Sequence, residues 1–257
     1  MRNARAFISI TLLASLCLAL IAGCAKQEPA ASVELVLMCG SSFVPPAEQL
    51  CQQFSARNPD IKIVTTVAGS EDFLPLVKAG QKGDILITHD PYLDETDKAG
   101  ALLDSVHVGY VAPVVAVQKG NPKDVKSIED LTREGLTVGL TDPQYSTCGE
   151  MVFALLEKKG IKDAVLANVE NRLTKGHSTL GTWLKTQTVD AVIMWNGVAN
   201  TFKDDLDLVK TPYEYDEEIR VHVIGLSYSK QIEALKKFIA FAKDKAPDIF
   251  ADHGYVK

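Results

Sequence analysis

Apolar strand-like runs alternate with helical patterns along most of this chain of 257 residues, which narrows the possible folds sharply. The predicted strands are short and apolar, and they cover residues 34–38, 61–67, 84–88, 110–117, 136–140, 191–195 and 220–226. Helices are predicted between them at 46–57, 71–79, 149–159 and 230–243. Such alternation is typical of α/β proteins built around a mostly parallel sheet.

One of these strands indicates that the chain forms two lobes. The run 110–117 is long, contains Pro113 and is followed by a Gly-Asn-Pro turn, so it could carry the chain from one lobe into another. A second crossing at 211–218 would bring the chain back. We therefore expect one lobe from 33–112 and 212–257 and a second from 113–211. A single continuous domain is the alternative.

The N-terminal residues have the composition of a secretion signal. Arg2 and Arg5 precede an apolar stretch at 7–22, which is short for the alternative, a membrane-spanning helix. The following sequence LIAGC at 20–24 resembles the bacterial lipobox, in which the cysteine is acylated and becomes the new N-terminus. We expect a signal peptide at 1–23, lipidation of Cys24 and a lipidated tether at 24–32. The protein would then be anchored to a membrane in the periplasm or at the cell surface.

The distribution of charge argues against nucleic acid as a partner. The formal net charge is −6, and no run of Lys or Arg offers a binding surface for a phosphate backbone. Loss of residues 1–23 removes two arginines and no acidic residue, so the charge of the mature chain becomes −8. An anion would not be steered to this protein by its overall field.

Three cysteines remain after the signal and the lipid site, namely Cys39, Cys51 and Cys148. In an oxidising compartment at most one pair can close, so at least one of the three is free, capped or a ligand. A bond between Cys39 and Cys148 would join loops of the two expected lobes and hinder their opening. We expect that bond not to form.

Four loops could bind a ligand, because ligands of open α/β sheets lie beyond the carboxyl ends of the strands. Each loop is rich in small and hydroxyl residues and precedes a predicted helix; their sequences are CGSS at 39–42, AGS at 68–70, YSTCG at 145–149 and GHST at 176–179. Free N–H groups and the positive ends of helix dipoles would gather there. The alternative for any single loop is simple capping of the helix by Ser or Thr. Together the four loops favour a site for a small oxyanion.

The chain from 35 to 257 resembles the molybdate-binding (ModA-type) group of type II periplasmic solute-binding proteins, the receptors of ABC importers. The resemblance rests on LVLMCGSS, TTVAGSEDFLPLVKAG, GDILITHDP, APVVAVQKGNP, LTVGLTDP, VDAVIMWNG and IFADHGYVK, in the family's order. It implies the type II periplasmic binding protein fold, in which two α/β lobes joined by two crossover strands close over a tetrahedral oxyanion.

The resemblance also implies the ligand-binding residues. The family's first two serines fall on Ser41 and Ser70, and its Tyr falls on Trp195, which has an indole N–H donor and no acceptor. Asn196 could supply the missing contact. The full predicted set is Ser41, Ser42, Ser70, Thr147, Cys148, His177, Ser178, Trp195 and Asn196.

We therefore expect a lipid-anchored receptor that captures molybdate or tungstate and delivers it to the permease of an ABC importer, as a monomer without cofactor or bound metal. A second hypothesis places a metal or a thiophilic ligand on Cys39, Cys148 and His177, with His89 nearby. Catalysis is not expected, because no nucleophile elbow, phosphate loop or paired-carboxylate motif is present. The sequence does not decide which oxyanion is preferred, and sulfate is one of the candidates.

Overall fold

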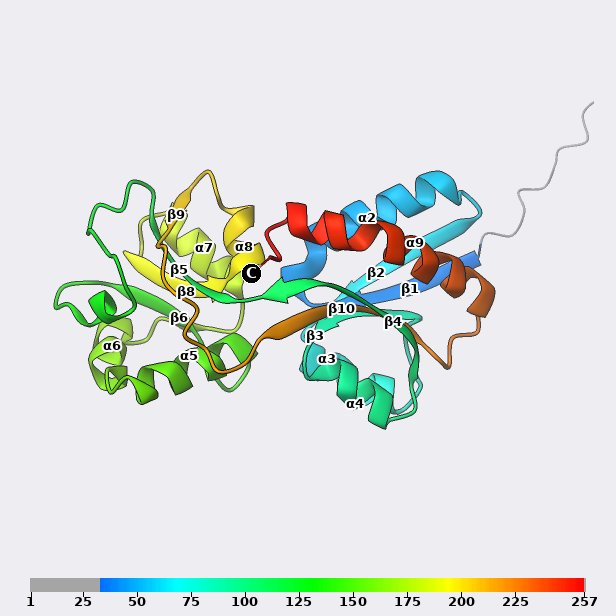
Figure 1. Ribbon diagram of the computed structural model, residues 1–257, viewed down its shortest axis with the longest axis horizontal. Helices are drawn as coiled ribbons and strands as arrows, with labels where there is room; N and C mark the ends of the chain where they lie inside the picture. Colours follow the sequence, from blue (N-terminus) through cyan, green and yellow to red (C-terminus); the bar gives the residue numbers. More distant parts are fainter. Residues whose placement is uncertain (1–32, 257) are drawn as a thin grey trace, which may run out of the picture. The chain divides into compact units, whose positions relative to one another are not determined.

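The structure is a computed structural model that describes residues 33–256, which form one compact unit. It contains two five-stranded sheets with helices on their faces (Figure 1). The expected α/β fold class is thus confirmed. The expected signal peptide, the lipid site at Cys24 and the tether lie outside the described residues.

The first sheet has the strand order β2-β1-β3-β10-β4. Its strands are β1 (Val33–Cys39), β2 (Ile61–Val67), β3 (Ile85–His89), β4 (Leu102–Val111) and β10 (Ile219–Leu226). β1 is parallel to β2 and β3, whereas β10 is antiparallel to both β3 and β4. Four of the five strands therefore run in one direction, in agreement with the prediction of a mostly parallel sheet. β10 runs against them because it re-enters the sheet from the opposite end after the chain returns.

The second sheet has the order β7-β6-β8-β5-β9. Its strands are β5 (Pro113–Gln118), β6 (Val138–Thr141), β7 (Leu173–Thr174), β8 (Ala191–Trp195) and β9 (Leu206–Leu208). β6 is parallel to β7 and β8, and β5 is antiparallel to β8 and β9. Each sheet thus combines parallel strands, whose carboxyl ends share an edge, with antiparallel strands.

The helices cover both faces of each sheet. α2 (Val44–Arg57) and α9 (Ile232–Asp252) lie over one face of the first sheet, with α3 (Ser70–Lys78) and α4 (Tyr92–Lys98) on the other (Figure 1). α5 (Thr147–Lys158) and α6 (Lys162–Val169) lie on one side of the second sheet, and α7 (His177–Lys185) and α8 (Asn196–Thr201) on the other. Two short 3-10 helices, η2 (Ser41–Phe43) and η3 (Glu129–Thr132), complete the order. α4, α6, α8, β7 and β9 were not predicted.

Two boundaries differ from the sequence prediction for physical reasons. The run 110–117 is two strands of different sheets, β4 and β5, which meet around Ala112 and Pro113 because proline has no N–H to continue a ladder. α9 continues past 243 through Pro247 to Asp252, because Ile249 and Phe250 extend its buried face.

The chain returns from the second sheet to the first through residues 209–218, which form no helix or strand. Ion pairs tie this return segment to α5. Lys158 Nζ lies 2.6 Å from Asp216, and Lys159 pairs with Glu214. These two ion pairs connect the return segment to α5. None of the helices in the described part of the chain has the length and apolar character that crossing a membrane requires.

Candidate ligand-binding site

One pocket collects loops from both sheets. Its lining residues follow β1, β2 and β3 of the first sheet and β6, β7 and β8 of the second, and they are Gly40, Ser41, Ser42, Phe43, Gly69, Ser70, Glu71, His89, Tyr145, Ser146, Thr147, Lys175, His177 and Trp195. Every segment lies at the carboxyl end of its strand, where α/β proteins bind ligands. The pocket thus brings together the four loops that the sequence indicated.

The pocket has a volume of about 90 Å³. Pockets for drug-sized organic ligands are larger, at about 300–1,000 Å³. The size therefore fits a small inorganic solute.

The C-terminal segment packs against the first loop and supports it. Ser41 begins η2 after Gly40 and is exposed, whereas the adjoining Phe43 is buried. The hydroxyl of Tyr255 donates to the carbonyl of Ser42, and its ring centroid lies 5.6 Å from that of Phe43. The loop carrying the two serines therefore has a fixed support.

The second loop places Ser70 at the first position of α3. The Ser70 side chain is buried, and its hydroxyl lies 2.7 Å from that of Thr88, with either able to donate. Neither Ser41 nor Ser70 caps its helix, since the capping positions are Gly40 and Gly69. Simple N-capping therefore does not account for these two serines.

In the third loop, Ser146 and Thr147 line the pocket, whereas Cys148 lies in the core. Ser146 caps α5 by accepting a hydrogen bond from Gly149 N at 3.4 Å, and Thr147 follows in the pocket lining. Cys148 is fully buried and does not line the pocket. Burial raises the pKa of its thiol, which stays protonated. Only its backbone could face a ligand.

His177 opens α7 and is buried in the pocket wall. Its Nδ1 accepts a hydrogen bond from the backbone N–H of Trp195 at 3.3 Å, so the neutral ring carries its proton on Nε2. Burial, and next the nearby His89, lower its pKa to about 3. The ring stacks on that of Trp195 with centroids 5.6 Å apart. His177 is thus an uncharged donor.

Several lining residues were missed by the sequence prediction for an oxyanion. His89, which the sequence offered only for the metal hypothesis, ends β3 and is 9% exposed. Its position after a buried strand was the available signal. At the rim, Lys175 Nζ lies 3.7 Å from the ring centroid of Tyr145, with Glu71 exposed in the same lining. The rim therefore carries charges of both signs.

Two further predicted residues do not line the pocket. Ser178 is exposed one position beyond His177. Asn196 is buried, and its side chain is occupied by backbone groups: Oδ1 accepts from Ala112 N at 3.2 Å, and Nδ2 donates to the carbonyls of Tyr110 and Val256. Asn196 therefore secures the first crossing and the C-terminal segment.

A model of the bacterial extracellular solute-binding protein family matches residues 35–256. The chain belongs to this family. The curated molybdate-binding protein ModA of Mycobacterium tuberculosis is 25% identical over 190 residues, which cover 68% of this chain and 72% of that protein. The resemblance noted in the sequence is confirmed.

Two solved structures share the fold of this solute-binding protein. The sulfate-binding protein SubI from Mycobacterium tuberculosis has a TM-score of 0.69 at 18% identity, covering 87% of this chain and 86% of that one. The periplasmic molybdate-binding protein of Azotobacter vinelandii has a TM-score of 0.67 at 17% identity, covering 87% and 99%. At such identities the likeness shows the fold, which is the expected type II periplasmic binding protein fold.

The geometry does not provide the metal site of the second hypothesis. Within residues 33–256, no three His, Cys, Asp or Glu side chains gather closely enough to hold a metal ion. Cys39 and Cys148 are both fully buried in the core of this solute-binding protein, so neither thiol reaches the pocket with His177. All three cysteines from 33 onward are free thiols.

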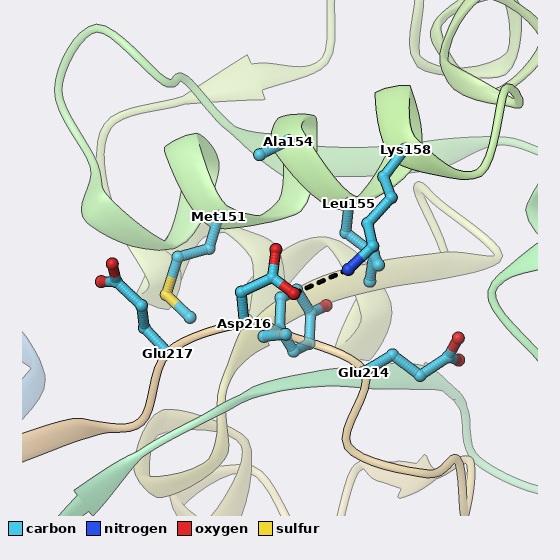
Figure 2. Close-up of a pocket in the computed structure, with 8 residues that line it drawn as sticks. Met151, Ala154, Leu155, Lys158, Glu214, Asp216 and Glu217 are labelled. Atoms are coloured by element: carbon cyan, nitrogen blue, oxygen red, sulfur yellow. Dashed lines mark hydrogen bonds and ion pairs between the residues drawn. The ribbon is translucent and has the colours of Figure 1, made fainter.

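A second pocket, of about 180 Å³, lies between α5 and the return segment. Figure 2 shows Met151 and Leu155 on its helix side, with the Lys158–Asp216 ion pair across it. The acidic side chains Glu214, Asp216 and Glu217 line it, and it shares no lining residue with the pocket at the strand ends. It offers no convergent donors for an anion.

Proposed function

We propose that this protein captures a small tetrahedral oxyanion, molybdate or tungstate first, in the pocket at the strand ends. The observation that carries the proposal is the meeting of serine and threonine hydroxyls and helix N-termini in a space of about 90 Å³. The name of its molybdate-binding mycobacterial relative supports the choice of anion. Sulfate has the same tetrahedral shape and is the competitor to be tested.

Neutral donors suit this task. Ser41, Ser70 and Thr147 offer hydroxyls, His177 offers an uncharged N–H, and the first turns of η2, α3, α5 and α7 offer backbone N–H groups. Donors aimed at an anion form hydrogen bonds about twice as strong as those between neutral groups. Because the chain is acidic overall, affinity would come from these local donors and not from a long-range field.

Membership of an extracellular solute-binding family supports a location of this protein outside the cytoplasm. We further propose that Cys24 carries a lipid, that the receptor is monomeric, and that it hands its anion to the permease of an ABC importer in the periplasm or at the cell surface. As the family consists of solute receptors, we propose no catalytic role and no cofactor. The proposed lobes are 33–112 with 212–257, and 113–211.

Replacing Ser41 and Ser70 by Ala tests the site directly. A hydrogen bond to a charged group contributes about 1.5–3 kcal/mol, so each variant should weaken molybdate binding about 10- to 100-fold. Isothermal titration calorimetry on residues 25–257, which include the whole compact unit, gives the Kd.

Ser178→Ala is the matched control, because Ser178 lies next to the pocket but does not line it. Its Kd should equal that of the unsubstituted chain. If the double variant Ser41→Ala, Ser70→Ala binds molybdate as tightly as the unsubstituted chain, the site assignment is wrong.

A further inference from the structure

The two histidines of the pocket hold their protons on opposite nitrogens. His177 Nδ1 accepts a backbone N–H, so its proton is on Nε2. His89 Nδ1 lies 2.7 Å from the carbonyl oxygen of Asp90, which can only accept, so the proton of His89 is on Nδ1. In its neutral form His89 therefore has a lone pair on Nε2.

The Nε2 lone pair of His89 is available to a ligand in the pocket. The Nδ1 edge of the ring is bound to its own backbone, and the rings of Phe43, Tyr92 and Trp195 surround His89 with centroids 5.6 to 6.1 Å away. Within residues 33–256, the His89 ring makes no hydrogen bond besides the one from Nδ1 to Asp90, and His89 lines the pocket. An acceptor thus stands among the donors of the site.

A fully deprotonated oxyanion has only acceptor oxygens, so it would be repelled by this lone pair. A proton on Nε2 converts the acceptor into a charged donor, while the bond from Nδ1–H to Asp90 is retained. We propose that His89 takes up one proton when the pocket binds a fully deprotonated oxyanion such as molybdate, which makes His89 a determinant of the site's specificity. This inference rests on the proposed function of the same pocket.

The charged and titratable groups around His89 are consistent with a neutral ring in the empty pocket. Burial lowers the pKa of His89, the neighbouring Asp90 raises it less, and His222 lowers it further. The Asp90 carboxylate is itself bound to Arg220 and His222.

Of the titratable groups around the pocket, we expect only His89 to change its charge when an anion binds. His177 stays neutral, Tyr92 has a pKa raised by burial, and the rim carries both Glu71 and Lys175. A bound dianion would favour the imidazolium of His89 and raise its pKa. Affinity is then greatest at low pH, and it falls about tenfold per pH unit between the pKa values of the empty and the occupied pocket.

Isothermal titration calorimetry measures the number of protons that the protein takes up on binding. Residues 25–257 are titrated with molybdate at about pH 7.5 in Hepes and in Tris, whose ionisation enthalpies differ, and the dependence of the heat on the buffer gives the protons taken up. The unsubstituted chain should take up close to one proton. His89→Gln, which cannot titrate, should take up none, and its Kd should not vary between about pH 6 and 8.5.

His107→Gln is the matched control, because His107 is exposed on β4 and does not line the pocket. It should keep the proton uptake of the unsubstituted chain. Tight molybdate binding without proton uptake, or uptake that persists in His89→Gln, would overturn the inference and leave the proposed function intact. The absence of heat with every oxyanion in both buffers would instead overturn the proposed function.

Discussion

The side chain of Asn196 provides a sharp test of the structural account, because it separates a connecting role from a ligand-binding one. Its amide makes three hydrogen bonds to backbone groups of Tyr110, Ala112 and Val256. Replacement by Ala removes all three, each worth about 1 kcal/mol net, so we expect a loss of about 3 kcal/mol in the free energy of unfolding. For a chain of this size that corresponds to a fall in Tm of about 6–12 °C.

Differential scanning calorimetry on residues 25–257 measures this fall, with Asn200→Ala as the control. Asn200 lies on the same helix and makes a single exposed hydrogen bond of 3.5 Å to Asp252, so its replacement should lower Tm by less than about 2 °C. At temperatures well below Tm, Asn196→Ala should weaken molybdate binding less than Ser41→Ala does. A small change in Tm together with a large loss of affinity would refute the connecting role.

Three further predictions concern the C-terminal segment, the thiols and the lipid site. Tyr255→Phe keeps the ring against Phe43 but loses the hydrogen bond to Ser42, so Tm should fall by only about 2–6 °C. Molybdate binding should also weaken, and an unchanged Kd would show that this hydrogen bond does not position the loop. Cys39 and Cys148 are fully buried and burial raises the pKa of both thiols, so both should react with iodoacetamide at neutral pH only after unfolding, whereas half-buried Cys51, whose pKa is raised to about 12, should react slowly; fast labelling of Cys39 or Cys148 in the native chain would contradict their burial. Mass spectrometry of the protein expressed in bacteria should find a lipid-modified Cys24 at the N-terminus, and a chain that keeps residues 1–23 in full would disprove processing at that point.

The sequence allowed the pocket loops to be located, because the carboxyl ends of parallel strands share an edge. Ser41, Ser70 and Thr147 each follow a predicted strand and precede a helix, and the structure places all three around one pocket. His177 joins them there, although the strand before it, β7, was not predicted. The same rule applied to the strand ending at His89 would have added that residue.

Other features depend on contacts far apart in sequence. The partners of Asn196 at the first crossing lie 84 and 86 residues away, so nothing local distinguishes it from a ligand contact. The antiparallel direction of β10 is set by where the return segment enters the sheet, which strand periodicity cannot reveal. The proton position on His89 depends on the Asp90 carbonyl, a feature of backbone geometry alone.

The most direct test of the central claim, a pocket for a small oxyanion, is a thermal-shift panel on residues 25–257. Molybdate, tungstate, sulfate, phosphate, arsenate, arsenite and zinc are compared at equal concentration. A ligand at about 100 times its Kd stabilises by about 2.7 kcal/mol, which raises Tm by about 5–11 °C. We expect this rise with molybdate or tungstate; a rise with zinc or arsenite alone, and none with any of the tetrahedral oxyanions, would contradict the claim.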